Sequence, residues 1–215
     1  SIIEKNGSIY LTGGSNGLVS VSGTIDASGL GVDEAGGIVH ILGNKVGLYD
    51  YARIDISGDA GGGLLLVGGD YQGLGSIPTA LENYVGPNVS IFADAVTGGN
   101  GGRTIFWADR RTEFFGTIRS RGGRLFGDGG FAEVSGKEEL YFAGSVDTTA
   151  ANGKSGTLLL DPDTITISGG SGTASASGAA SFTTYEDVLE SVASTTNIDM
   201  LATSSITLGN SLSFA

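Results

Sequence analysis

Short apolar, strand-like runs recur along the chain between polar and glycine-rich stretches, and each run opens on a Gly-Gly or Ser-Gly pair. The five runs occupy residues 36–44, 62–70, 101–109, 129–137 and 155–163, and their starts lie 26, 39, 28 and 26 residues apart. A second strand-like run accompanies each, at residues 23–29, 52–58, 89–95, 116–123 and 144–150. A degenerate repeat of this length, with short strands and glycine at the corners, predicts a β-solenoid with coils of about 26–28 residues.

Aligning the runs on their first glycine places residues of one kind in columns. One column of the first strand is apolar in every copy and contains Ile41, Val67, Phe106, Val134 and Leu160. The second strand gives an equivalent column of Ile25, Ile54, Ile91, Ile118 and Val146. Alternate strand residues face the same side, so both columns should point inward, with equivalent residues stacked ~4.8 Å apart. The column that directly follows the second one along the same strand is mostly polar and should face solvent; it contains Asp26, Asp55, Phe92, Arg119 and Asp147.

The outward column predicts one contact between coils. Arg119 and Asp147 occupy equivalent positions in successive repeats. Opposite charges that lie side by side on neighbouring strands attract each other. We therefore expect an exposed ion pair between these two residues, which would stabilise the fold by well under ~1 kcal/mol.

An insertion breaks the repeat where its interval lengthens to 39 residues. It covers residues 73–86 and carries the apolar side chains Ile77, Leu81 and Tyr84. The neighbouring strands are unusually apolar on their outward side, where Leu66 and Trp107 lie. We expect the insertion to loop off the stack and to pack over these side chains, because exposed apolar patches of that size are rare.

The second break separates residues 1–168, which hold the regular coils, from residues 169–215. Residues 168–181 are almost entirely Gly, Ala and Ser and predict a flexible excursion. A short helix is expected near 184–193, with Thr184 as its N-cap and Asp187 completing an approximate capping box. Strand patterns return at 206–210, and the chain stops inside another, so we interpret it as a piece of a longer protein.

Composition narrows the class of protein. The 215 residues include 39 glycines, 3 prolines and no cysteine, which excludes disulfides, thiol catalysis and cysteine-based zinc sites. A net charge of −12 argues against nucleic-acid binding and against an anionic membrane surface. No apolar run reaches membrane-spanning length. We expect neither nucleic acid nor membrane insertion among the partners.

Several segments together carry a family resemblance. GGLLLVGGDYQG (62–73), the WAD triplet (107–109), GGFAEVSGK (129–137) and LLLDP (158–162) resemble filamentous-haemagglutinin-like exoproteins of the two-partner secretion pathway. The resemblance covers at least residues 36–168. It implies a right-handed parallel β-helix, a secreted or cell-surface location in Gram-negative bacteria, and export through a dedicated outer-membrane transporter. That transporter would engage an N-terminal domain outside this chain, since the Asn-rich motifs of that domain do not occur here.

The sequence gives little support for a catalytic site or a metal site. β-Helix enzymes that act on polysaccharides cluster carboxylates in one groove, whereas Phe92 and Arg119 interrupt the outward aspartates. Asp161 and Asp163 are close in sequence, but Pro162 between them indicates the end of a strand. The tandem calcium-binding nonapeptide and the EF-hand spacing are both absent. We therefore assign no catalytic residue, metal or cofactor, and we interpret His40 as a surface histidine.

Basic residues are concentrated in one place. Six of the eleven Lys and Arg residues lie between 103 and 124: Arg103, Arg110, Arg111, Arg119, Arg121 and Arg124. One interpretation is a glycan site in which arginines bind charge and Trp107 stacks on a sugar ring. Its candidate ligand-binding residues are Arg103, Trp107, Arg119, Arg121 and Tyr84. The other interpretation is a solvent-exposed face whose positive charge is balanced by acidic residues of neighbouring coils, which is the more common role of surface charge.

The sequence thus predicts a structural and adhesive shaft segment of a large secreted exoprotein. Its loops would contact host cells, neighbouring bacteria or polysaccharide. Two alternatives stay open at this point, namely a polysaccharide-active β-helix enzyme and a passive stalk that presents a toxin or effector domain. Fold alone does not decide among them.

Overall fold

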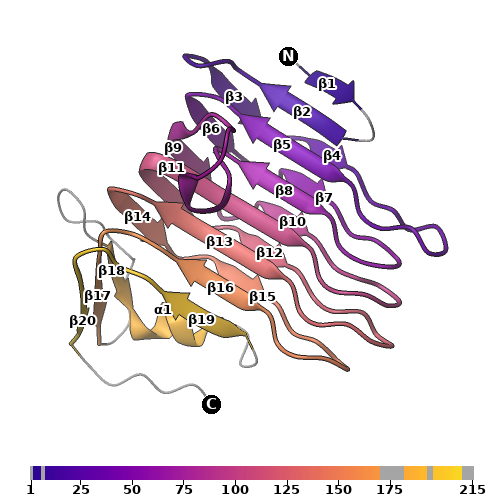
Figure 1. Cartoon of the computed structure of the whole chain (residues 1–215). Coiled ribbons are helices and arrows are strands. Elements are labelled where there is room, and N and C mark those ends of the chain that lie inside the picture. The colour runs from indigo at the N-terminus through magenta and orange to yellow at the C-terminus, as the bar shows by residue number, and fades with distance from the viewer. Residues whose placement is uncertain (1, 6–7, 170–181, 193–195, 210–215) are drawn as a thin grey trace.

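The computed structural model describes residues 2–5, 8–169, 182–192 and 196–209. Nearly all of its regular structure is β, and strands from successive repeats lie side by side down the molecule (Figure 1). Among the strands within these ranges, every pairing is parallel except that of β1 with β2 at the N-terminal end. The expected β-rich, parallel and solenoid-like stack is therefore confirmed.

Two strand rows share one large sheet. The first row is β1 (Ile2–Lys5), β2 (Ser8–Thr12), β5 (Ile38–Leu42), β8 (Leu64–Val67), β11 (Arg103–Phe114), β13 (Phe131–Gly136), β16 (Thr157–Leu160) and β19 (Asn197–Met200). The second row is β3 (Leu18–Val21), β6 (Lys45–Leu48), β9 (Ala80–Val85), the second half of β11, and β14 (Glu139–Phe142). The long strand β11 belongs to both rows and joins them.

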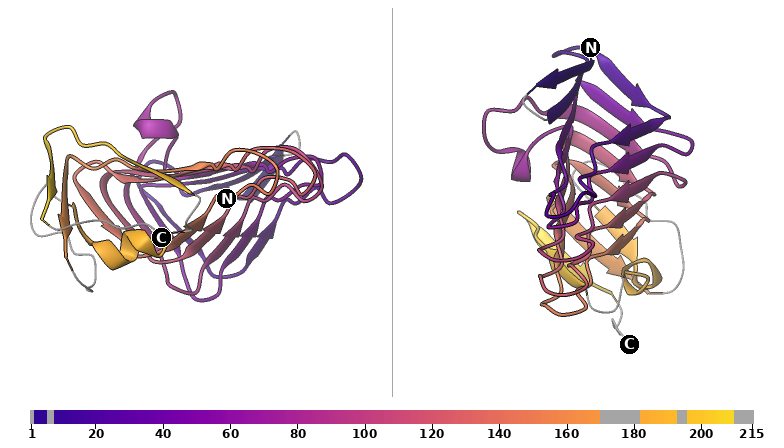
Figure 2. Two further views of the ribbon diagram at one scale, coloured as in Figure 1. Left: turned by 90° about the horizontal axis from the view of Figure 1, so that it is seen from below. Right: turned by 90° about the vertical axis from the view of Figure 1, so that its right-hand side faces the viewer.

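The opposite sheet is formed by the third strand of each coil. Its order is β4 (Thr24–Asp26), β7 (Arg53–Asp55), β10 (Ser90–Phe92), β12 (Thr117–Arg119) and β15 (Ser145–Asp147). At the C-terminal end a small sheet pairs β18 (Phe182–Tyr185), β17 (Thr164–Ser168) and β20 (Ser205–Leu208). Seen along the stack, the coils superimpose as a flattened outline with one loop standing away from it (Figure 2).

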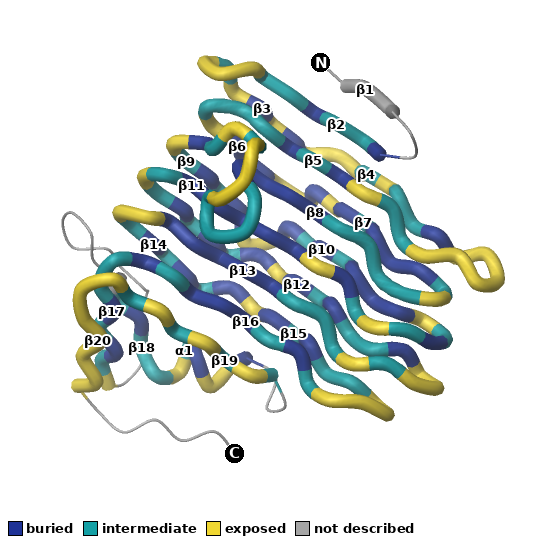
Figure 3. The backbone as a smooth tube through the Cα atoms, viewed as in Figure 1, coloured by how far each residue is buried: buried dark blue, intermediate teal, exposed yellow. Residues whose placement is uncertain are grey.

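The core consists of the predicted inward columns. Ile25, Ile54, Ile91, Ile118 and Val146 pair with one another across β4, β7, β10, β12 and β15. Leu11, Ile41, Val67, Phe106, Val134 and Leu160 do the same across the large sheet. Most members are fully buried, and the buried segments repeat from coil to coil in Figure 3. Both column assignments are confirmed.

The sequence did not predict the strands of the second row. They contribute another inward column, in which Leu48, Val85, Phe114 and Phe142 are paired in order. The rings of Phe114 and Phe142 stack with centroids 5.9 Å apart. Next to this column, the Asn83 side chain donates to the carbonyls of Val67 and Trp107, so polar residues satisfy backbone groups where the strands bend.

The insertion is shorter than predicted. Residues 80–85 are strand β9, which is built into the stack between β6 and β11. Burial alternates over its second half, where Asn83 and Val85 are buried on either side of the partly exposed Tyr84. The part that leaves the stack therefore ends at Thr79 and contains a single 3₁₀ turn, η1 (Tyr71–Gly73).

The predicted helix is also shorter. Helix α1 spans Glu186–Glu190, and its N-cap is Tyr185, which makes no side-chain capping bond. The predicted N-cap, Thr184, is buried in β18 and pairs with Ile167. The ladder to β17 uses this backbone, so Thr184 cannot cap the helix. The strand expected at 206–210 is present as β20, whereas residues 170–181 of the predicted flexible stretch lie outside the described residues.

Candidate functional site

The insertion loop covers the outward side of the large sheet. Tyr71 and Ile77 pack against a small cluster of Leu66, Ile105 and Trp107, which is separate from the main core. Trp107 keeps only 7 % of its surface exposed, and its indole N–H donates to Asp109 at 3.2 Å. The expected cover is thus confirmed for Ile77. It also means that Trp107 is already packed against protein and has no open face for a sugar ring.

Two carboxylates fix the tip of this loop. The backbone N–H of Gln72 donates to both oxygens of Glu133, at 3.1 and 3.3 Å. The Gln72 side chain reaches one coil further and donates from Nε2 to Oδ2 of Asp161 at 3.0 Å. Gln72 adopts a left-handed backbone conformation with φ of 52°, which is uncommon outside glycine. Contacts to two coils therefore hold one strained residue in place.

Glu133 is fully buried, which changes its acidity. Removal from water raises the pKa of Glu133 to about 7; Asp161 adds repulsion, whereas Gln72 and Arg103 oppose the rise. Burial also raises the pKa of Asp161, together with repulsion from Asp163. Sequence reasoning passed over Glu133. The one available signal was an acid placed between Ile105 and Leu159 in the same outward column.

On the opposite sheet, two of the predicted arginines share one carboxylate. Asp94 accepts from Nε and Nη2 of Arg119 at 2.9 and 2.6 Å, and from the backbone N–H and Nη2 of Arg121 at 2.9 and 3.0 Å. Asp94 is only 5 % exposed. Burial alone would raise the pKa of Asp94, but these hydrogen bonds outweigh it and the pKa lies below its ordinary value. Asp94 and the two arginines lie along a groove of about 660 Å³.

The expected ion pair between Arg119 and Asp147 does not form. Arg119 turns instead toward Asp94 on the preceding coil. Asp147 accepts the backbone N–H of Thr149 at 3.0 Å and reaches only Arg121, at 4.0 Å. Asp26 and Asp55 accept the N–H two residues further on in the same way. The outward aspartates therefore cap the turn of their own coil, which competes with pairing between coils.

The remaining candidate residues lie apart from Asp94. Arg103 is on the large sheet, with its guanidinium 4.9 and 4.5 Å from the ring centres of Tyr71 and Phe131. Tyr84, on β9, stacks with Tyr49 at 5.3 Å. The fold thus brings Arg119 and Arg121 together but places Arg103, Trp107 and Tyr84 on the other sheet. Arg110 pairs with Glu82 and Arg111 with Glu113, so much of the basic stretch is neutralised locally.

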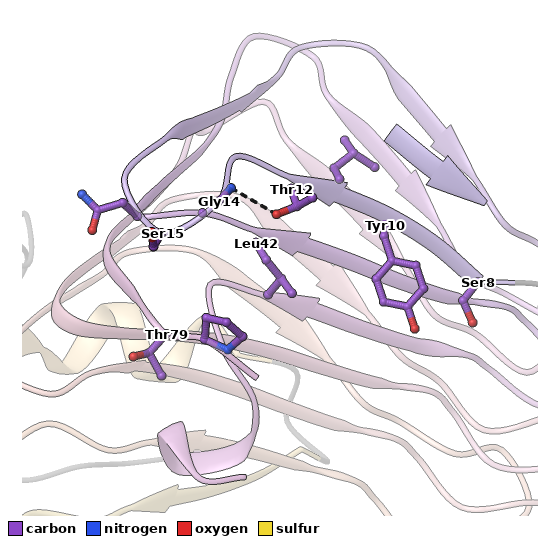
Figure 4. A pocket seen from close by; sticks show the side chains of 11 residues that line it. Ser8, Tyr10, Thr12, Gly14, Ser15, Leu42 and Thr79 are labelled. Atoms are coloured by element: carbon purple, nitrogen blue, oxygen red, sulfur yellow. Dashed lines mark hydrogen bonds between the residues drawn. The ribbon is translucent and has the colours of Figure 1, made fainter. Parts of the chain in front are cut away.

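A cleft of about 720 Å³ opens beside the insertion loop, at the N-terminal end of the large sheet (Figure 4). Its floor consists of outward side chains of β2 and β5, among them Tyr10, Thr12 and Leu42. Pro78 and Thr79 of the loop form one wall. None of the lining residues that the structure describes is charged. No pattern in the sequence indicates this cleft, because it arises where the loop stands over two coils that lack an equivalent loop.

Among the described residues, no group of three or more His, Asp or Glu side chains is arranged to hold a metal ion. No helix in the same part of the chain is long and apolar enough to cross a membrane. The chain was also compared with known proteins. No protein-family model matches it, and no curated protein matches it either.

Proposed function

We propose that the chain is a shaft segment of a large secreted surface exoprotein, folded as a right-handed parallel β-helix. The observation that carries the proposal is the unbroken parallel register of the large sheet from β2 to β16. Such a stack grows by adding coils, since each coil offers its backbone N–H and C=O groups to the next. The hand is the usual one for parallel crossover connections.

The surface chemistry supports a scaffold. Arg119, Arg121, Arg110 and Arg111 are engaged by carboxylates of their own or neighbouring coils. Stability comes from ladders and columns, which suits an extracellular chain without a single cysteine. Adhesion would then use the parts that stand away from the stack, above all the insertion loop that ends at Thr79.

The resemblance to filamentous-haemagglutinin-like exoproteins completes the proposal. On this reading a two-partner transporter of the outer membrane exports the parent protein from a Gram-negative bacterium. The shaft would then be displayed on the cell surface or released from it. The passive-stalk alternative shares the fold and location and differs only in lacking a ligand.

One observation bears on the enzyme alternative. Glu133 and Asp161 do lie close together, bridged by Gln72, and a carboxyl group with a pKa of about 7 is common in hydrolase sites. The carboxylate of Glu133 is nevertheless fully buried beneath the loop, away from any polysaccharide. This arrangement favours a structural role for the pair.

The proposal is tested on cells and on beads. Antibodies raised against residues 1–215 should label intact cells that express the parent protein, and deletion of the partner transporter should abolish the labelling. Labelling that requires permeabilised cells would overturn the surface location. Beads coated with the folded fragment should adhere to host cells or to bacterial biofilm, whereas beads that never adhere would favour the passive stalk.

A further inference from the structure

Hydrogen bonds hold in place the wall of the Figure 4 cleft that the insertion loop forms. Thr79 donates its hydroxyl to Asp109, and Ala80 donates its N–H to the carbonyl of Gly68 at 2.6 Å. Leu81 N–H donates to the carbonyl of Asn44, which ties the end of the loop to the rim of the cleft at 2.8 Å. These bonds hold the loop from its far side, so the wall of Pro78 and Thr79 is already in place before any ligand arrives.

The lining combines apolar surface with uncharged polar groups. Leu42 and Pro78 supply aliphatic contact, and the ring of Tyr10 stands on the cleft floor in Figure 4. Ser8, Ser15 and Asn44 add hydroxyl and amide groups around it. A cleft of about 720 Å³ is within the range of small-molecule sites, which pair apolar walls with a few polar groups.

The aromatic neighbour of Tyr10 is also uncharged. His40 is paired in register with Tyr10 on the adjacent strand, and the two ring centroids lie 4.5 Å apart. Burial lowers the pKa of His40, against a weaker opposing effect of Asp70, so the imidazole is neutral at pH 7. Among the described lining residues, an anionic ligand would find no cation and a cationic one no carboxylate.

We propose that this cleft binds a neutral oligosaccharide, with a sugar ring packed against Tyr10 and its hydroxyls bonded to the polar rim. A pyranose has an apolar C–H face and a periphery of hydroxyls, which matches an aromatic floor bordered by serine, threonine and asparagine. The inference rests on the proposed adhesive function and gives it a ligand class. The site differs from the arginine-centred one that the sequence suggested.

The test measures binding of the folded 215-residue chain to neutral glucose-, galactose-, mannose- and N-acetylhexosamine-containing oligosaccharides and to their sialylated or sulfated counterparts. We expect at least one neutral probe to bind, with affinity reduced at least tenfold by Tyr10→Ala and by Leu42→Arg, which fills the cleft. Tyr51→Ala serves as the matched control, because Tyr51 is 78 % exposed and does not line the cleft. Arg119→Ala/Arg121→Ala should also leave the affinity unchanged.

Three results would overturn the inference: no neutral probe bound at millimolar concentration, binding of acidic probes only, or equal affinity for wild type and Leu42→Arg. Thermal melting of each variant shows whether it is folded. Bead adhesion separates this inference from the proposed function. If beads coated with Leu42→Arg still adhere, the cleft is not the adhesive site, but the adhesive function of the chain stands. If wild-type beads never adhere, the adhesive function itself is contradicted.

Discussion

Gln72 and Glu133 are 61 residues apart in the chain, yet the backbone N–H of Gln72 lies 3.1 Å from the Glu133 carboxylate. The contact joins the tip of the insertion loop to a strand two coils further along the stack. The loop and Glu133 stabilise each other. The carboxylate holds the loop tip in place, and the loop supplies hydrogen bonds without which a buried carboxylate would be costly. The loop is therefore part of the fold rather than an appendage to it.

Glu133→Gln should remove a pH dependence of stability. Glu133 has an ordinary pKa of 4.5 when exposed and one of about 7 in the folded chain. Between these values the folded state binds more protons than the unfolded state, so the free energy of unfolding falls as the pH rises through this window. The loss is at most about 3.5 kcal/mol, because each pKa unit corresponds to ~1.4 kcal/mol.

Glutamine cannot ionise but keeps a carbonyl oxygen for the Gln72 N–H. Urea unfolding of both proteins between pH 4 and 8 measures the effect. Their difference in unfolding free energy should move in favour of Glu133→Gln as the pH rises from about 4.5 to about 7 and then level off. Parallel curves for the two proteins would show that Glu133 ionises as freely in the folded chain as in the unfolded one.

Gly73 gives a direct test of the loop's position. It has a positive φ of 64°, and a Cβ added to it would collide with the indole of Trp107. Gly73→Ala should therefore lift the loop, expose Trp107 and shift its fluorescence to longer wavelength. Trp107 is the single tryptophan of the chain, so the signal has one source. Gly75→Ala is the matched control. Gly75 also has a positive φ, but a Cβ added to it would meet only the Asp70 carboxylate, at an ordinary contact distance of 3.7 Å.

The inward columns could be predicted because successive side chains of a strand point to opposite faces. Once the repeats are aligned on their glycines, a single register buries the apolar residues. Ile54, Ile91 and Ile118 are the same residue at equivalent positions, which alone indicates that they are neighbours. Strand β9 was missed because its column changes chemistry, from Val46 to Asn83 to Thr112. Those two polar residues bond to backbone at a bend, which no periodicity reveals.

The contacts made by side chains were harder to predict than the strands. The sequence placed Arg119 beside Asp147 correctly, since the two are paired in register. It could not show that Arg119 would pair with Asp94 in preference to its direct neighbour Asp147. Asp94 lies diagonally across on the other side of Arg119 and is more deeply buried. The Gln72–Glu133 contact was beyond reach for another reason, because it depends on how a single non-repeating loop folds back.

Asp94 should contribute more to stability than any other outward aspartate. Asp94→Ala removes the shared acceptor of Arg119 and Arg121 and should cost about 3 kcal/mol, in the range seen when a buried pair loses one partner. Arg119→Ala should cost less, since Arg121 still pairs with Asp94. A double-mutant cycle of the two changes, read by urea unfolding, should give a coupling energy above about 1 kcal/mol. Asp26→Ala is the comparison on an exposed position, and an equal cost for both aspartates would contradict the assignment.

Ile118→Asp tests the inward columns that define the stack. Ile118 is fully buried between Ile91 and Val146, so an aspartate there would be a charge with no partner in the core. Each coil is stabilised mainly by its neighbours, so the damage should spread beyond one strand and abolish cooperative folding. Thr117→Asp places the same side chain one residue earlier on the exposed face and should change stability by less than about 0.5 kcal/mol. Circular dichroism melting compares the two, and a wild-type-like melt of Ile118→Asp would mean that β12 faces the other way.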